Sequence, residues 1–213
     1  LSQHALDLGI SQSNYAAAHE AFTKAQSIAL REGDTALEMW TLARAGRVGF
    51  FFLDNRECIL KDGQAEELNK SVGDPNIVPF SGMCVVGAQM SIGETQAARS
   101  ELEAMLDMAE RARFRFGIVT TLWSDAIFSL ATGDWESARQ VIERALTLNP
   151  AMGGLVEAEL FLESTLGNID RAEGYLERLR ELTPKGPGSL FILFSVVSTL
   201  VEQGNKESLE MYK

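Results

Sequence analysis

The sequence predicts an all-α fold: a right-handed superhelical stack of antiparallel helix pairs, or α-solenoid, of about five to six repeats. Three observations predict it. A six-residue pattern recurs at regular steps, a small residue recurs at its last position, and glycines and prolines separate segments of helical length. Regular internal repeats are typical of solenoids, because each repeat buries its apolar face only against the next one.

The recurring pattern is clearest in the C-terminal half of the chain. Residues 133–138 (GDWESA) and 167–172 (GNIDRA) begin in the same way, and their first glycines are 34 residues apart. Pro150 and Pro184 follow them with the same spacing. Further copies begin at longer steps, at positions 13, 53, 93 and 204. The chain is therefore expected to repeat one structural unit along its whole length.

A column of small residues runs through these copies. It consists of Ala18, Cys58, Ala98, Ala138 and Ala172. A small side chain lets the second helix of each pair approach the first, whereas a large one would cost about 1–3 kcal/mol in overpacking. Cys58 fits this column as a small apolar residue rather than as a reactive thiol.

Turn residues divide the chain into alternating first and second helices. Glycines at 93, 133, 167 and 204 suit the left-handed residue after a helix, and Asp134 suits the N-cap of the next. Thr35 with Glu38 reads as a capping box, and Asp74 before Pro75 as a helix start.

First helices are expected near 36–52, 77–91, 117–131, 154–166 and 189–202. Second helices are expected near 14–31, 54–71, 94–113, 134–148 and 168–182, with partial helices at 1–9 and 205–213. We therefore expect residues 1–213 to be a single array, cut from a longer one at both ends.

The segment from Gly133 to Pro150 resembles the second half of a tetratricopeptide repeat (TPR), and 167–184 resembles it more weakly. The longer steps of 40 residues resemble the helical arrays of large bacterial signalling ATPases, such as maltose-regulator-like transcription activators and ATPase-linked nucleotide cyclases. This resemblance implies a region that senses an inducer or a partner, while separate modules carry the enzymatic or DNA-binding activity.

In a stack of this kind the first helices line the concave face, and positions three or four apart share one face of a helix. Registering the repeats gives four sets of positions. They are Trp40, Ala43, Arg47 and Phe50; Phe80, Met83, Gly87 and Met90; Thr120, Trp123, Ile127 and Leu130; and Gly154, Glu157, Phe161 and Ser164.

The predicted partner-binding residues are the aromatic, aliphatic and arginine members of these sets. They are Trp40, Arg47, Phe50, Phe80, Met83, Met90, Trp123, Ile127 and Phe161. Methionine and aromatic anchors suit an apolar or amphipathic peptide. An aromatic stripe at helical spacing also suits core packing, and both interpretations stay open. Arg47 could receive a carboxylate, although an acid of a neighbouring helix is the simpler partner.

Composition excludes several other functions. The formal net charge of −11 would repel a phosphate backbone, so no direct nucleic-acid contact is expected. Two isolated cysteines fit a reducing cytoplasm. The apolar run Leu190–Val201 is too short to span a membrane, which takes about 20 residues.

No motif for catalysis, for a metal or for a phosphate group is present. His4 and His19 have no zinc-ligand spacing, and the glycines lack a phosphate-loop context. Acid pairs such as Glu66–Glu67 and Glu157–Glu159 are expected on solvated helix faces. We therefore predict a protein that is not an enzyme and has no cofactor.

The sequence thus favours a protein-interaction scaffold or sensor region of a larger bacterial regulatory protein, acting in signal transduction or transcription regulation. Its partner would be a protein or peptide held in the concave groove. The alternative is a sensor that binds a small-molecule inducer inside the superhelix. The apolar segment Leu190–Val201 near one end could also support a homodimer.

Overall fold

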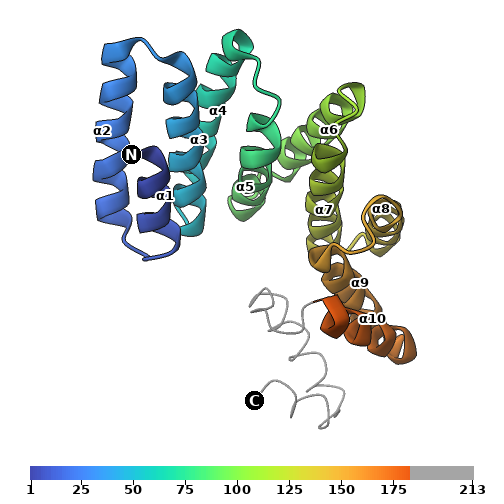
Figure 1. The fold of residues 1–213 in the computed structure, drawn as a ribbon. Coiled ribbons are helices and arrows are strands. Elements are labelled where there is room, and N and C mark those ends of the chain that lie inside the picture. The colour runs from blue at the N-terminus through green and yellow to red at the C-terminus, as the bar shows by residue number, and fades with distance from the viewer. Residues whose placement is uncertain (183–213) are drawn as a thin grey trace. The chain divides into compact units, whose positions relative to one another are not determined.

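The computed structural model describes residues 1–182, which form ten α-helices and no strand (Figure 1). The helices are α1 (Ser2–Ile10), α2 (Tyr15–Glu32), α3 (Thr35–Phe51), α4 (Asn55–Val72), α5 (Ile77–Ser91), α6 (Thr95–Arg111), α7 (Arg115–Thr132), α8 (Trp135–Leu148), α9 (Gly153–Thr165) and α10 (Ile169–Leu182). Within this range the predicted helix bounds lie within two residues of the observed ones, which confirms the all-α repeat. The predicted helices at 189–202 and 205–213, and the apolar segment proposed for a dimer, lie outside the described residues.

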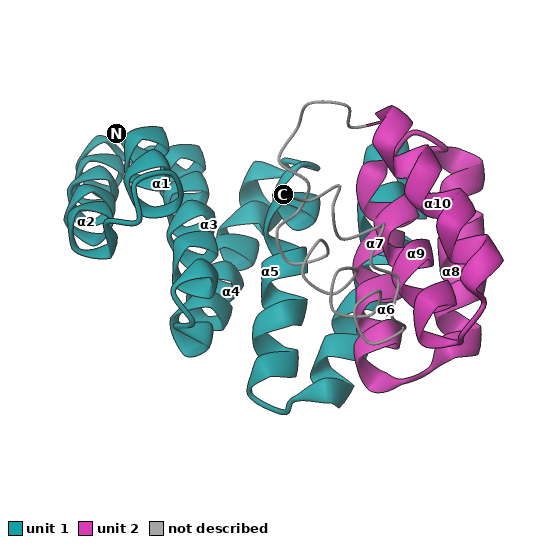
Figure 2. Cartoon of the chain, turned by 90° about the horizontal axis from the view of Figure 1, so that it is seen from below, with its two compact units in different colours: residues 1–121 teal, residues 122–213 magenta. Residues whose placement is uncertain are grey.

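The chain divides into two compact units, which Figure 2 colours separately. Unit 1 comprises residues 1–121, and unit 2 comprises residues 122–213. Unit 1 holds α1 to α6 and the start of α7, and unit 2 holds the rest of α7 together with α8 to α10. A single continuous array over 1–213 stays a prediction.

In unit 1 the first helices pack on one another as well as on their own second helices. α1 contacts α2, α3 contacts α4, and α5 contacts α6, which gives three helix pairs. In addition α1 contacts α3, and α3 contacts α5. The first helices therefore form a row, and side chains on the face that they share lie close together.

The column of small residues is buried, as predicted. Ala18, Cys58, Ala98 and Ala138 are 0% exposed, and Ala172 is 2% exposed. Opposite Cys58, α3 presents Gly49, where an added Cβ would lie 3.4 Å from the Cys58 backbone nitrogen. Small residues on both helices thus let α3 and α4 approach closely, and Cys58 serves as a packing residue.

The turn between the first and second helix of each pair has one residue in the left-handed conformation. Its φ is 50° at Ser13, 62° at Leu53, 84° at Gly93, 77° at Gly133 and 76° at Gly167. The three glycines adopt this conformation without steric cost, whereas Leu53 does so against the clash of its Cβ. The weak copy of the pattern at 53–58 is therefore a true structural repeat.

Two of the predicted N-caps were wrong, although the helix bounds themselves were close. The N-cap of α3 is Asp34, whose Oδ1 accepts a hydrogen bond from the Leu37 N–H at 2.9 Å, and Thr35 is the first helical residue. α5 begins at Ile77, in agreement with its predicted range of 77–91, but its N-cap is Asn76 rather than Asp74. Polar residues close together compete for the cap position: Asp34 directly precedes Thr35, and Asn76 follows Asp74 by two residues, so the caps were ambiguous in the sequence.

None of the helices in the described part of the chain has both the length and the apolar character needed to cross a membrane.

Candidate functional site

All nine residues predicted for the groove lie on first helices, and all nine are partly exposed. Six belong to unit 1: Trp40, Arg47 and Phe50 on α3, and Phe80, Met83 and Met90 on α5. The other three belong to unit 2: Trp123 and Ile127 on α7, and Phe161 on α9. Partial exposure fits a side chain that packs against its neighbours and still presents one edge to solvent.

Four other members of the registered sets do not face a groove. Ala43 is 0% exposed, Leu130 8%, Glu157 6% and Ser164 2%. The expectation of a glutamate on the groove surface was therefore wrong. Positions three apart on a helix diverge from one line by tens of degrees, so a register drawn from spacing alone includes residues that turn into the core.

The best-defined surface feature of unit 1 is an aromatic–arginine cluster, made of Trp40, Arg44, Arg47 and Phe80. The Trp40 and Phe80 rings meet edge to face, with centroids 5.2 Å apart. The Arg44 guanidinium carbon lies 5.1 Å from the Trp40 ring centroid, and that of Arg47 lies 4.8 Å from the Phe80 centroid. Each ring thus carries a guanidinium within the range of a cation–π interaction.

The connection between α4 and α5 fixes the position of Trp40. Its indole N–H donates to Asp74 Oδ2 at 3.0 Å. Asp74 in turn accepts from the Asn76 backbone and side-chain nitrogens, both at 2.9 Å. The hydrogen bond from the Asn76 backbone, followed by those from the Asn76 side chain and Trp40, lowers the pKa of Asp74 against the effect of burial. The ring is therefore held in place before any partner arrives.

The two arginines of the cluster have few partners of their own. Arg44 Nη1 donates to Ser2 Oγ at 2.8 Å, and Arg44 Nε is buried without a hydrogen-bond partner. Arg47 Nη1 donates to the Phe80 carbonyl oxygen at 3.3 Å. Within residues 1–182 neither guanidinium forms an ion pair, so the expectation that an acid of a neighbouring helix holds Arg47 was wrong.

Arg44 was missed by the sequence analysis, although the signal was available. It lies four residues after Trp40, a spacing that places it on the same face of α3. The alignment of the repeats in the sequence analysis placed Ala43 in this set instead of Arg44. Burial lowers the pKa of the Arg44 guanidinium, which reflects its partial loss of water.

Phe50 lies at the far end of the same face and contributes more to packing than to the surface. An added Cβ on Gly87 would lie 2.8 Å from two carbons of the Phe50 ring. The ring also packs on the buried cluster of Cys58, Cys84 and Ala88. Gly87 therefore makes room for Phe50 between α3 and α5.

The predicted groove residues of unit 2 pack mainly on its core. Ile127 and Phe161 lie against a buried cluster that includes Ala126 and Leu162. The Trp123 ring covers Gly154, where an added Cβ would lie 2.9 Å from the indole nitrogen. That nitrogen is buried, and no residue within 1–182 accepts a hydrogen bond from it.

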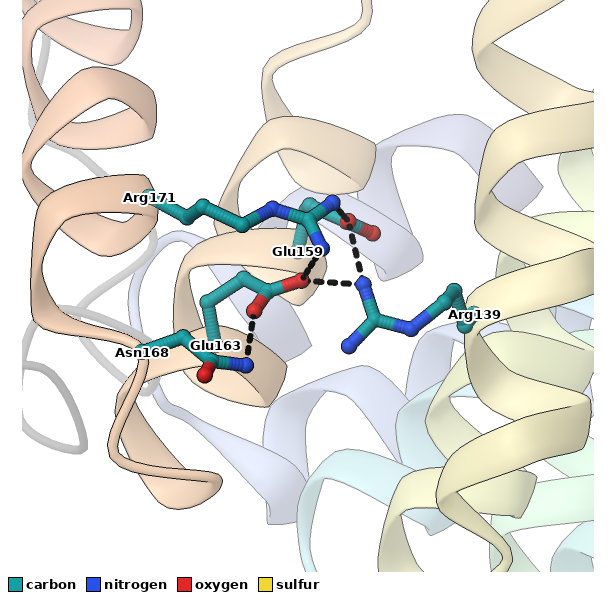
Figure 3. A network of polar contacts seen from close by, with 5 residues as sticks. All are labelled: Arg139, Glu159, Glu163, Asn168 and Arg171. Carbon is teal, nitrogen blue, oxygen red and sulfur yellow. Dashed lines mark hydrogen bonds and ion pairs between the residues drawn. The ribbon is translucent and has the colours of Figure 1, made fainter.

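Unit 2 contains a charge network around two buried glutamates, made of Arg139, Glu159, Glu163, Asn168 and Arg171 and drawn in Figure 3. Arg139 hydrogen-bonds Glu163 and lies 3.6 Å from Glu159. Arg171 lies 3.5 Å from Glu159 and 3.1 Å from Glu163. Asn168 Nδ2 donates to Glu163 Oε2 at 2.7 Å. The network connects α8, α9 and α10, and its two carboxylates balance its two guanidiniums.

The two glutamate side chains of this network are 0% exposed, so the expectation that Glu159 lies on a solvated face was wrong. Burial and the neighbouring Glu163 raise the pKa of Glu159. Burial acts in the same direction on Glu163, but hydrogen bonds from Arg139 and Asn168 outweigh it and lower its pKa. A sequence shows charge pairs within one helix, whereas these partners come from three helices.

Unit 1 also buries a carboxylate, and within residues 1–182 this one has no ion pair. Asp62 on α4 is 1% exposed, its Oδ2 accepts from Cys58 Sγ at 3.6 Å, and its Oδ1 has no hydrogen-bond partner. Burial raises its pKa to about 7, with smaller contributions from Glu66 and Glu101. Burial also raises the pKa of the Cys58 thiol, in keeping with its packing role.

Two concave features bear on a small-molecule site in unit 1. A cavity of about 40 Å³ lies among α2, α3 and α4, beside Tyr15, Phe22 and Leu42. A more open cleft of about 300 Å³ is lined by α4, α5 and α6, with Glu66 and Glu101 on its walls. Neither includes a residue of the predicted groove. Among the described residues no group of three or more histidine, cysteine or acidic side chains is arranged to hold a metal ion.

Comparison with solved structures places this fold among helical-repeat proteins. The structure superposes on the apo form of RapI with a TM-score of 0.66 and 13% sequence identity, over 98% of this chain and 66% of that chain. It superposes on TTC0263, a thermophilic TPR protein of Thermus thermophilus, with a TM-score of 0.65 and 17% identity, over 94% of this chain and 100% of that one. The chain thus spans slightly less than two thirds of RapI.

The sequence matches no protein-family model and no curated protein. At these identities the structural likeness concerns the fold. It confirms the predicted tetratricopeptide-like helical repeat, while the narrower resemblance to the arrays of bacterial signalling ATPases stays a prediction.

Proposed function

We propose that this chain is a non-catalytic protein-interaction scaffold, and that unit 1 binds a peptide or a segment of a partner protein along α3 and α5. The observation that carries the proposal is the partly exposed face made by the aromatic–arginine cluster together with Met83 and Met90. Rigid aromatic rings, arginine and adaptable methionine are the residue types that carry most binding energy at protein interfaces.

The arrangement suits an amphipathic segment. The rings and methionines offer apolar contacts along the row of first helices, and the arginines add polar specificity at one end. The chain would act as the partner-sensing part of a larger regulatory protein, in line with the resemblance to bacterial signalling arrays. We propose the groove of unit 1 as the principal site because the unit 2 residues Trp123, Ile127 and Phe161 mainly pack on their own core.

The proposal can be tested by selecting binders of the full chain from a random peptide library and measuring their affinities by fluorescence anisotropy. Replacing Met83 and Met90 together by serine removes apolar contact from the proposed face. We expect at least about tenfold weaker binding of the selected peptides, the loss typical of a contributing interface residue. Circular dichroism should show unchanged helicity, since both side chains are partly exposed.

Met108→Ser is the matched control. Met108 is 48% exposed on α6, a second helix, and lies outside the proposed face. Its replacement should leave the affinities unchanged. If Met108→Ser weakens binding as much as the double variant does, or if the double variant binds normally, α3 and α5 do not form the site. A thermal-shift screen that finds a metabolite but no peptide would favour the inducer sensor instead.

A further inference from the structure

The cleft lined by α4, α5 and α6 holds two acidic side chains without a counter-charge. Glu66 on α4 and Glu101 on α6 lie on its walls, and both are half-buried. Within residues 1–182 neither of them forms an ion pair. Lys70, which also lines the cleft, is paired with Glu67 instead. The fold therefore places two carboxylates in one cleft and gives neither of them a cationic partner from the described chain.

Partial burial makes a cation favourable in this cleft. Burial raises the pKa of Glu101. Burial also raises the pKa of Glu66, with a further increase from the charge of Glu101 and a decrease from Lys70. A charge that has lost water without gaining a counter-charge raises the free energy of the unbound protein. Since Glu101 acts on Glu66 through its charge, one small cation can lie near both carboxylates and recover part of that free energy.

A third acid lies next to the cleft and supports the same conclusion independently. Asp62 precedes Glu66 by one turn on the same face of α4. Its side chain is buried, at 1% exposure, and its Oδ1 accepts no hydrogen bond within residues 1–182. Burial raises the pKa of Asp62, and the charges of Glu66 and Glu101 raise it further. A buried carboxylate with an unsatisfied oxygen therefore adds to the attraction that this part of unit 1 exerts on a cation.

The cleft also has an apolar wall. Val78 on α5 is 6% exposed, and Met105 on α6 is 2% exposed. Met105 packs against Gly82, where an added Cβ would lie 2.5 Å from the Met105 sulfur. Met108, three residues further along α6, is 48% exposed. These side chains offer a surface for an aliphatic chain, and the cleft volume of about 300 Å³ is enough for a small organic molecule.

We propose that this cleft binds an ammonium group on a short aliphatic chain, with Glu66 and Glu101 as acceptors and Val78, Met105 and Met108 against the chain. An ammonium group has three N–H donors and forms strong hydrogen bonds to carboxylates. Two carboxylates supply fewer ligands than Ca²⁺ or Mg²⁺ requires, so a metal ion fits less well. The ammonium group can belong to a free amine or to a lysine side chain, since both carry it at the end of an aliphatic chain. The site is separate from the groove along α3 and α5 and does not depend on the proposed function.

NMR of the full chain, labelled at the methionine methyl groups, tests the inference with three small probes. They are pentylamine, the neutral pentan-1-ol and N-acetyl-lysine N-methylamide. We expect at least one of the two amines to shift the Met105 and Met108 signals in a saturable way, and the alcohol to leave them unchanged. The amine that binds more tightly indicates whether a free amine or a lysine side chain is the natural source. Equal shifts with the alcohol, or no shift with either amine, would overturn the inference.

A charge-matched pair of double variants completes the test. Glu66→Gln with Glu101→Gln should weaken binding of the effective amine by about tenfold or more, the range for lost charged hydrogen bonds. Circular dichroism should show unchanged helicity, because a neutral amide costs less to bury than a carboxylate. Glu94→Gln with Glu103→Gln changes the net charge equally at two exposed positions and should change the affinity less than about twofold. Equal losses in both double variants would show that only the overall charge matters, and the site would fall.

Failure of this inference and failure of the proposed function can be told apart. Met108→Ser removes part of the apolar wall and should weaken binding of the amine by about threefold, while selected peptides bind as before. Met83→Ser with Met90→Ser should have the opposite effects. If the amines do not bind but the Met83 and Met90 variant loses its peptides, the groove stands and the cleft site falls. If the amines bind but that variant keeps its peptides, the cleft site stands and the groove falls.

Discussion

Two pairs of arginines, one in each unit, have opposite surroundings. In unit 2, Arg139 and Arg171 enclose two fully buried glutamates (Figure 3). In unit 1, Arg44 and Arg47 lie on aromatic rings and meet no carboxylate of the described chain. The first pair completes its charge balance within the fold, so its role is structural. The second pair has no acidic partner within residues 1–182, so its positive charge is available to a ligand.

The two pairs of arginines should differ most in how much a single substitution lowers the free energy of unfolding. Arg139→Gln should lower the free energy of unfolding of unit 2 by about 3 kcal/mol, because it removes a main partner of buried Glu163 and leaves an uncompensated charge. Arg47→Gln should cost less than about 1 kcal/mol, since it removes one hydrogen bond to a carbonyl and one ring contact. Hydrogen exchange of the α9 and α5 peptides, followed by mass spectrometry, measures both.

A second change distinguishes a lost partner from lost packing. Adding Glu163→Gln to Arg139→Gln removes the stranded charge and should recover part of the stability. If the double variant loses as much unfolding free energy as the two single variants lose together, Arg139 and Glu163 are not coupled. If Arg47→Gln destabilises unit 1 as much as Arg139→Gln destabilises unit 2, the contrast between the pairs is lost.

The buried acids of the two units should respond to pH in different ways. Burial raises the pKa of Asp62 from 3.8 to about 7, so the folded state binds its proton more tightly than the unfolded state does. Its stabilising effect is complete below pH 3.8 and is lost as the pH rises towards 7 and beyond. Between about pH 6 and pH 8 the opening free energy around α4 should fall by about 1 kcal/mol. The lowered pKa of Glu163 acts in the opposite sense, because its contribution is lost as the pH falls.

Hydrogen exchange of α4 peptides at the two pH values tests this dependence. Asparagine is polar but does not ionise, so Asp62→Asn should make the opening free energy around α4 independent of pH in this range. Glu67→Gln, at an exposed position of the same helix, should leave the pH dependence of the opening free energy unchanged. A slope that persists in Asp62→Asn would point instead to the half-buried Glu66 and Glu101, whose pKa values are also raised by burial.

The smallest expected effect concerns the repeated turn. Leu53 in unit 1 has a φ of 62° and is 80% exposed, whereas Gly133 in unit 2 holds the equivalent position with a φ of 77°. Leu53→Gly should raise the free energy of unfolding by about 0.5–1 kcal/mol, as relief of the left-handed strain exceeds the added chain entropy. Gly133→Ala should lower it by about 1 kcal/mol. Urea denaturation followed by circular dichroism measures both changes. Destabilisation by Leu53→Gly would show that the Leu53 side chain makes stabilising contacts.

The arrangement of helices could be predicted closely because its signals are local. These signals are the spacing of small residues, the left-handed glycines and the N-cap at Asp134. Each acts within one helix and its adjoining turn, and each requires a particular residue type that can be recognised in the sequence. The N-caps at Thr35 and Asp74 were mispredicted because several polar residues compete for one cap. Of the residues predicted for the groove, Trp40, Arg47 and Phe80 lie in contact with one another, whereas Arg44 was overlooked, and the binding role of all four stays a prediction.

By itself, the sequence determined the all-α repeat, the alternation of first and second helices and the buried column from Ala18 to Ala172, since these follow from residue size and turn chemistry at regular intervals. Only the tertiary structure decided which charges are satisfied. The partners of Arg139 come from α9, and the ring beneath Arg47 comes from α5. Such contacts depend on side-chain directions across separate helices, which the spacing along one helix does not encode.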